Sequence, residues 1–155
     1  MAKDTKQNMA ISNFNLEVLN TKDLSQHIAA SIQIGSNIAI FGRRGIGKTQ
    51  IAKYEIKKAT LIEVYINLSV FERTDIGGYP RIMSSDVDRK FIDFILPQFY
   101  QPMIEGKKEV VALLDEVDKA DPSIWAPLLE FTQFRSINGR PLSNLKAVIL
   151  TGNFI

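Results

Sequence analysis

Apolar residues near the start of the chain recur at the spacing of a helix face. Leu24, Ile28 and Ile32 stand four positions apart, and the residues between them are mostly polar. Because side chains four residues apart share one face of a helix, this pattern predicts an amphipathic helix. The helices expected along the chain cover residues 21–33, 48–58 and 122–134.

Short apolar runs separate these helices and predict strands. The run at 110–114, Val-Val-Ala-Leu-Leu, is apolar throughout, which is typical of a strand covered on both faces. Apolar strands that alternate with helices predict an α/β domain built on a mainly parallel sheet. The strands expected cover residues 37–41, 61–68, 110–114 and 147–151.

Two parts of the chain lack such a pattern. Residues 1–12 are mostly polar and are expected to form a flexible N-terminal arm before a single domain at 13–155. Residues 69–109 hold turn signals at 75–80 and 84–86 and a mixed apolar and charged segment at 91–99, so no regular element is assigned to them. Asn138-Gly139 predicts a hairpin turn.

Composition removes several classes of function. The chain has 155 residues with 45% hydrophobic and 23% charged residues, which fits one globular domain and excludes a wholly disordered chain. There is no cysteine and one histidine, His27, so disulfides, thiol catalysis and cysteine-based zinc sites are excluded. A net charge of +2 gives no indication of nucleic-acid binding. No apolar run approaches the roughly 18 residues of a membrane span, and we expect a cytoplasmic protein.

The clearest chemical signal lies between the first predicted strand and the second predicted helix. Residues 42–49, Gly-Arg-Arg-Gly-Ile-Gly-Lys-Thr, fit the pattern G-x-x-x-x-G-K-[ST]. Glycines allow successive backbone N–H groups to surround a phosphate, and the helix start adds its positive dipole. Lys48 is expected on the β- and γ-phosphates and Thr49 on Mg²⁺; the alternative is a glycine-rich turn with an incidental lysine. The residues expected to contact nucleotide are Gly42, Arg43, Arg44, Gly45, Ile46, Gly47, Lys48, Thr49, Gln50 and Asp115.

Two carboxylates follow the apolar run at 110–114. The end of a parallel strand faces the ligand crevice of such a sheet, so Asp115 is expected to hold Mg²⁺ together with Thr49. Glu116 would then orient and deprotonate a water molecule, which favours hydrolysis over transfer to a small molecule. The alternative is a strand that ends in a solvated acidic turn.

An asparagine follows the last predicted strand. The Asn153 amide can donate to a γ-phosphate or hold the attacking water without adding charge. The alternative is an ordinary asparagine turn at a strand end.

These motifs in this order resemble an AAA+ ATPase, with Walker A at 42–49, Walker B at 110–116 and sensor 1 at Asn153. The stretch DEVDKADPSIWAPLLEFTQFRSINGRPL resembles the MoxR-type and dynein-related branches. The segments ERTDIGGYP at 72–80 and LPQFYQP at 96–102 resemble the same branches, and the likeness extends over about residues 13–154.

The resemblance implies a P-loop NTPase fold, a three-layer αβα sandwich, and hydrolysis of ATP to ADP with Mg²⁺. It gives catalytic roles to Glu116 as base, Lys48 on phosphate and Asn153 as γ-phosphate sensor. It also implies a ring, usually hexameric, that remodels a partner protein, with no nucleic acid or membrane indicated. Family members continue past the position of Asn153 into a further strand and a helical lid, so we expect an incomplete module whose phosphate-loop strand has an unpaired edge.

Two other functions stay open from the sequence: a nucleotide-gated binding module without turnover, and a P-loop kinase for small molecules. Arg135 and Arg140 are expected in a solvated hairpin, with a trans-acting arginine finger as the alternative. The segment 75–80 is either a connecting turn or a loop facing the pore of a ring. His27 is interpreted as an ordinary helix residue, with a place at the border of the adenine, as in related ATPases, as the alternative. Trp125 is interpreted as a residue of core or interface packing, with a base-stacking platform as the alternative.

Overall fold

A parallel sheet forms the centre of the protein. The computed structural model describes residues 17–83 and 91–154, so the predicted N-terminal arm and the turn signal at 84–86 lie outside the described residues. The sheet has four strands in the order β1-β8-β5-β2, and each neighbouring pair is parallel. Its strands are β1 (Asn37–Gly42), β8 (Leu145–Asn153), β5 (Val110–Asp115) and β2 (Ile62–Asn67).

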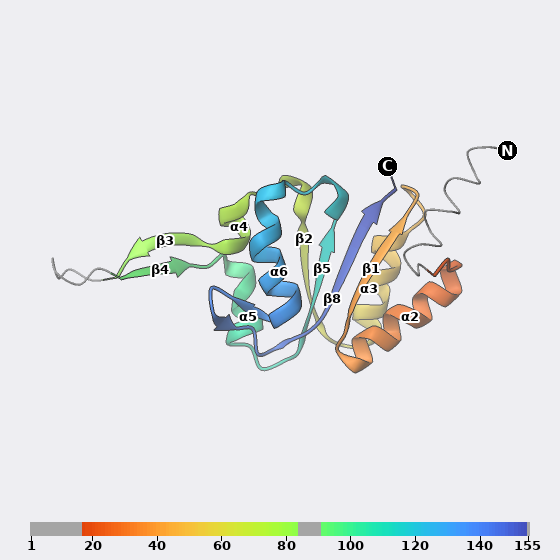
Figure 1. Ribbon diagram of the computed structural model, residues 1–155. Helices are drawn as coiled ribbons and strands as arrows, with labels where there is room; N and C mark the ends of the chain where they lie inside the picture. The colour runs from red at the N-terminus through yellow and green to blue at the C-terminus, as the bar shows by residue number, and fades with distance from the viewer. Residues whose placement is uncertain (1–16, 84–90, 155) are drawn as a thin grey trace.

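Helices cover both faces of this sheet (Figure 1). On one face, α2 (Thr21–Ile34) and α3 (Lys48–Lys58) pack through Ile28, Ile32, Ala52 and Ile56. The other face is covered by α4 (Arg73–Gly77), α5 (Gln101–Ile104) and α6 (Trp125–Phe134). The predicted α/β class with a parallel sheet is therefore confirmed.

Local chemistry accounts for where the first helix begins and ends. The Asn20 side chain accepts a hydrogen bond from the backbone N–H of Asp23 at 2.9 Å, which satisfies one of the free donors at the start of α2. Gly35 ends the helix with φ of +74°, and a side chain there would be strained. Among the described residues, no helix is both long and apolar enough to cross a membrane.

The helix expected over 122–134 has two parts. It starts with the 3-10 turn η4 (Pro122–Ile124) and continues as α6 from Trp125. Pro127 has no N–H to donate to the carbonyl of Ser123, so the α-helical hydrogen-bond pattern cannot extend back over the first residues.

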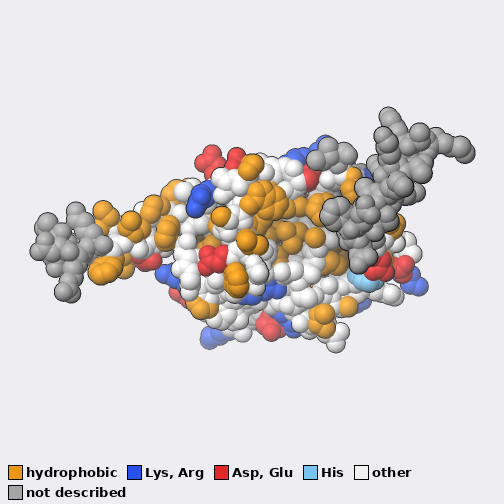
Figure 2. All heavy atoms as spheres, viewed as in Figure 1, with side chains coloured by type: hydrophobic (Ala, Val, Ile, Leu, Met, Phe, Trp, Pro, Cys, Tyr) orange, Lys and Arg blue, Asp and Glu red, His pale blue; other side chains and the backbone are white. Residues whose placement is uncertain are grey.

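A two-stranded antiparallel ribbon projects from the body (Figure 1). It consists of β3 (Tyr79–Ile82) and β4 (Ile92–Ile95). Apolar side chains cover much of its surface in Figure 2, and the exposed ones are Tyr79, Ile82, Met83, Phe91, Ile92 and Ile95. The segment 75–80 is not a plain connecting turn, because Asp75 and Gly77 belong to α4 and Pro80 belongs to β3. Its alternative interpretation, a segment facing the pore of a ring, stays a prediction.

The Glu130 carboxylate, on α6, holds the tight turn that follows this helix. It accepts hydrogen bonds from the Ser136 hydroxyl at 2.9 Å and from the backbone N–H groups of Asn138 at 3.0 Å and Gly139 at 2.8 Å. The turn joins β6 (Ser136–Ile137) to β7 (Arg140–Pro141), which confirms the predicted hairpin. Burial by itself would raise the pKa of Glu130, but these three donors outweigh it and the pKa is lowered.

We expect Glu130→Gln to lower the free energy of unfolding by about 1–2 kcal/mol at pH 7, because a neutral amide accepts these bonds more weakly than a carboxylate. The pKa of Glu130 is lower in the folded protein than in the unfolded chain. Its contribution is therefore present above the unfolded value of about 4.3 and is lost as the pH falls through the folded value. Urea unfolding of both proteins from about pH 7 to about pH 3.5 measures the difference.

The matched control is Glu105→Gln, since Glu105 is exposed and accepts no comparable set of bonds. It should change the free energy of unfolding by less than about 0.5 kcal/mol. A Glu130→Gln difference that stayed constant down to the lowest pH would contradict the assignment.

Candidate functional site

The loop between β1 and α3 turns sharply at two glycines. Gly45 and Gly47 have φ of +79° and +89°, in the left-handed region where a side chain would be strained. Gly47 is the N-cap of α3, and its carbonyl accepts the first helical hydrogen bond from Ile51 at 2.9 Å. The predicted strand, glycine-rich loop and helix are therefore present, and the start of an eleven-residue helix faces the loop.

Lys48 is buried beneath this loop, although lysine is rarely buried. Its ammonium donates to the backbone carbonyls of Gly42 at 3.0 Å and Arg43 at 2.9 Å, and to Asn153 Oδ1 at 3.0 Å. Burial lowers the pKa of Lys48, and the negative charges of Asp115 and Asp118 partly restore it.

The Asp115 carboxylate, at the end of β5, receives four hydrogen bonds. Its Oδ1 accepts from the Thr151 hydroxyl and from the Glu116 backbone N–H at 2.9 Å. Its Oδ2 accepts from Thr49 Oγ1 at 3.1 Å and from the Tyr65 hydroxyl at 3.0 Å. Burial acts to raise the pKa of Asp115, but these four donors outweigh it and hold the pKa below its ordinary value. The group is therefore an anion at neutral pH.

Glu116 has an uncommon backbone conformation for a residue other than glycine, with φ of 55° and ψ of 41°. The chain reverses here between β5 and η3 (Val117–Lys119), so Glu116 leaves the line of the strand. Its Oε1 lies 2.7 Å from the Lys119 ammonium. Hydrogen bonds from Lys119 and Ser69 lower the pKa of Glu116.

Asn153 links the glycine-rich loop between β1 and α3 to the segment that follows β5. Its side-chain oxygen accepts from Lys48, and its backbone N–H donates to Asp118 Oδ1 at 2.9 Å. It lies opposite Gly42 in the pairing of β8 with β1, so the two strand ends meet at the same edge of the sheet. The amide thus sits beside the lysine expected to bind phosphate.

One cavity of about 300 Å³ collects most of the predicted residues. Three predicted nucleotide ligands do not line it: the backbone carbonyls of Gly42 and Arg43 accept hydrogen bonds from Lys48, and the Ile46 side chain is exposed to solvent. The described residues that line the cavity are Arg44, Gly45, Gly47, Lys48, Thr49, Gln50, Asp115, Glu116, Gly152 and Asn153.

Sequence reasoning missed several residues that contact this set. Tyr65, Thr151, Asp118 and Lys119 each bond a predicted site residue. The sequence held only a partial signal for two of them: by strand alternation Thr151 shares a face with Asn153, and Tyr65 shares a face with Asn67. That Asn67 pairs with Asp115, which brings Tyr65 to the site, follows from the strand order alone. Burial and the bond to Asp115 raise the pKa of Tyr65 to about 12, so its hydroxyl stays a donor at neutral pH.

The donor set fits a magnesium ion held partly by a phosphate ligand. Thr49 Oγ1 and Asp115 Oδ2 lie 3.1 Å apart, and hydroxyl and carboxylate oxygens suit this cation. Within residues 17–83 and 91–154, no three His, Cys, Asp or Glu side chains gather as a metal site of their own. The protein residues would therefore bind Mg²⁺ through one carboxylate and one hydroxyl, with substrate phosphates and waters as the other ligands.

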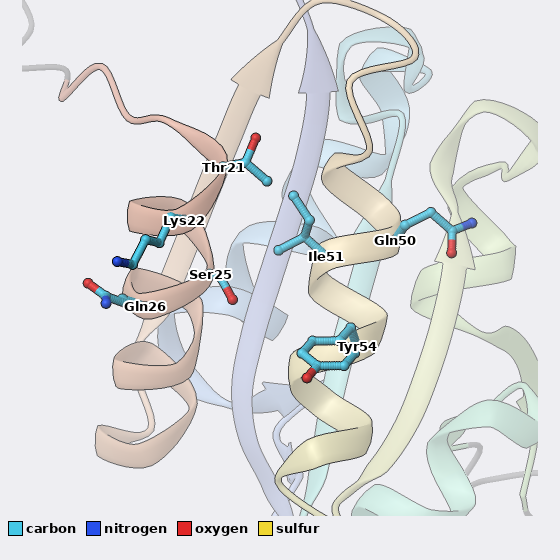
Figure 3. A pocket seen from close by; sticks show the side chains of 7 residues that line it. All are labelled: Thr21, Lys22, Ser25, Gln26, Gln50, Ile51 and Tyr54. Carbon is cyan, nitrogen blue, oxygen red and sulfur yellow. The ribbon is translucent and has the colours of Figure 1, made fainter.

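A second, more apolar cavity of about 660 Å³ lies between α2 and α3 (Figure 3). Thr21 and Ser25 from α2 and Ile51 and Tyr54 from α3 line it, and Gln50 is common to this cavity and the phosphate-loop cavity. Figure 3 shows the Gln50 side chain on the side of α3 away from α2.

The two arginines considered for an arginine finger differ. Arg135 is half-buried and donates to the carbonyls of Thr132 at 3.0 Å and Gly35 at 3.4 Å, so a solvated hairpin is the wrong interpretation for it. Arg140 is exposed, with its guanidinium 4.0 Å from Asp93.

Two aromatic residues stay outside both cavities. His27 is exposed and lies 3.8 Å from Glu17, and Trp125 is 48% exposed on α6.

Comparison with known proteins gave no match, either to a protein-family model or to a curated protein sequence.

Proposed function

We propose that this protein binds Mg-ATP and hydrolyses it, as an AAA+ module of the MoxR-like type. The observation that carries the proposal is the convergence of Lys48, Thr49, Asp115, Glu116 and Asn153 on one cavity. These residues come from three places in the sequence and include a buried lysine, an anionic carboxylate and a second acid. A glycine-rich turn or a solvated acidic turn alone would not require them to meet.

In this proposal the five residues of the cavity have separate roles in the hydrolysis of ATP. Lys48 and the N–H groups of the loop stabilise the negative charge that develops on the phosphates. Bound between Thr49 and Asp115, Mg²⁺ would neutralise charge on the β- and γ-phosphate oxygens. Glu116 accepts the proton of the water that attacks the γ-phosphate, and Asn153 donates to that phosphate.

The adjoining α2–α3 cavity suits the nucleotide base. It is mostly apolar and shares Gln50 with the phosphate site, so a base could lie there while its phosphates occupy the loop. Thr21 and Ser25 of α2 line it, and the Ser25 hydroxyl donates to Glu55 of α3.

Sheet order supports the AAA+ assignment over a kinase. The phosphate-loop strand β1 is at the edge, and β8 lies between it and the Walker B strand β5. The edge position of β1 agrees with what the resemblance implies, and the pairing of β8 with β1 brings Asn153 to Lys48. A small-molecule kinase has no evident use for the adjacent acids Asp115 and Glu116.

The apolar ribbon of β3 and β4 supports a protein partner. A short two-stranded ribbon gains little stability by itself, yet this one exposes aromatic and aliphatic side chains to solvent. In our proposal it contacts the remodelled protein. Self-association into a ring is part of the same proposal. Among the described residues β1 pairs only with β8, and the exposed Phe41 stacks on Phe154 beside its other edge, which offers a surface for this contact.

A nucleotide-gated module without turnover is the second candidate. The contact of Glu116 with Lys119 at 2.7 Å favours it, because this ion pair occupies the carboxylate that would act as base. In a working ATPase, Lys119 would have to leave Glu116 so that this carboxylate can accept a proton from water; in the gated module it would stay in place.

Titration with a fluorescent ATP analogue, followed by phosphate release from Mg-ATP over a range of protein concentrations, tests the proposal. We expect saturable binding and a specific rate of phosphate release that rises with protein concentration. Binding without release at any concentration would favour the gated module. ATP consumption only with an added small-molecule acceptor would favour a kinase, and no binding would refute all three.

A further inference from the structure

We propose that Tyr65 positions the Asp115 carboxylate for Mg²⁺ and thereby sets the magnesium requirement of nucleotide binding. Tyr65 would be a positioning residue, because it acts on the metal through Asp115. The inference rests on the proposed function, since it assumes that Thr49 and Asp115 hold the metal of a bound nucleotide. The Tyr65 side chain lies outside every motif that the sequence displays.

The geometry around Asp115 separates Tyr65 from the other donors. Oδ2, the oxygen that faces Thr49, accepts from Thr49 at 3.1 Å and from Tyr65 at 3.0 Å. A threonine hydroxyl can donate its proton and still offer a lone pair to a metal, so Thr49 serves both groups. Tyr65 is the second donor on that oxygen and comes from a different element, β2, so the two hydroxyls hold the carboxylate from separate directions.

The Tyr65 ring is itself held in place. The Lys53 ammonium, from α3, lies 4.2 Å from the centre of the ring and 3.3 Å from Glu63 Oε1. Glu63 and Tyr65 stand two positions apart on β2, so their side chains share the sheet face that α3 covers. Tyr65 is 42% exposed, so the Lys53 ammonium over its ring face, itself paired with Glu63, is the contact that favours this position of the ring.

A supporting group of this kind affects metal affinity more than nucleotide affinity. Loss of a residue that orients a metal ligand typically weakens metal binding about 10-fold to 100-fold. Three other donors remain on Asp115 in Tyr65→Phe, so we expect a smaller loss of Mg²⁺ affinity, about fivefold.

Magnesium titration of nucleotide binding tests the inference. Wild type and Tyr65→Phe are titrated with a fluorescent ATP analogue in EDTA, and then with Mg²⁺ at a fixed analogue concentration. We expect the Mg²⁺ concentration at half-maximal effect to rise about fivefold in Tyr65→Phe, with affinity in EDTA within about twofold of wild type. Lys53→Met leaves the hydroxyl in place but removes the charge over the ring, and it should shift the midpoint about twofold.

The control is Tyr79→Phe, since the Tyr79 hydroxyl, on the projecting ribbon, lies 3.5 Å from another aspartate, Asp75 of α4. It should leave the Mg²⁺ midpoint unchanged. An unchanged Mg²⁺ midpoint in Tyr65→Phe, or an equal loss of affinity with and without Mg²⁺, would overturn the inference. Wild-type protein that binds no analogue at all would refute the proposed function, and the inference with it.

Discussion

Replacing Lys48 with alanine is expected to weaken binding of Mg-ATP about 100-fold, equivalent to about 2.8 kcal/mol. The ammonium is the buried cation of the phosphate-loop cavity and already lies beside Asn153 at the strand end. Phosphate oxygens would take over contacts that its three donors now make with two carbonyls and one amide. A charge-assisted contact to phosphate contributes more than a neutral one, so its loss appears directly in the dissociation constant.

Lys57→Ala is the matched control, because Lys57 is exposed on the same helix. The affinity of Lys57→Ala for the ATP analogue should stay within about twofold of wild type. Lys57 lies in the last turn of α3, at the end away from the loop, where salt screens an exposed charge. Far-ultraviolet circular dichroism and thermal unfolding then establish that Lys48→Ala is still folded. Full affinity in a folded Lys48→Ala protein would contradict the assignment of the loop to phosphate.

Periodic patterns predicted the central fold from the sequence because they extend over many residues. The helix expected at 48–58 coincides with α3, and the strand expected at 110–114 differs from β5 by one residue. Residues 69–109 gave no such pattern, since their elements are three to five residues long. The β3–β4 ribbon also lacks the usual alternation, because it exposes apolar side chains on both faces.

The candidate site was predictable as far as its residues follow one another in the sequence. Lys48, Thr49, Asp115 and Glu116 belong to contiguous motifs with a known chemical logic. Tyr65 and Thr151 reach Asp115 only through the pairing of three strands, and the register of those strands is set by tertiary packing. Their contribution could not be assigned before the strand order was known.

Replacing Glu116 with glutamine is expected to lower phosphate release from Mg-ATP at least about 100-fold while the dissociation constant changes by less than about threefold. Glutamine has the size of glutamate and can still accept a hydrogen bond from Lys119, but its amide cannot take a proton from water. The neighbouring ligands of phosphate and metal, Lys48 and Asp115, keep their contacts. Phosphate release under saturating Mg-ATP, measured beside binding of the ATP analogue, separates the two quantities.

Glu109→Gln supplies the control, since Glu109 is another acid paired with a lysine, at 3.0 Å from Lys146, and lies at the opposite end of β5. Its rate should match that of wild type, because its carboxylate faces solvent rather than the cavity. Equal loss of binding and rate in Glu116→Gln would mean that the carboxylate holds the nucleotide in place instead of activating water. An unchanged rate of phosphate release in Glu116→Gln would exclude Glu116 as the base that activates water.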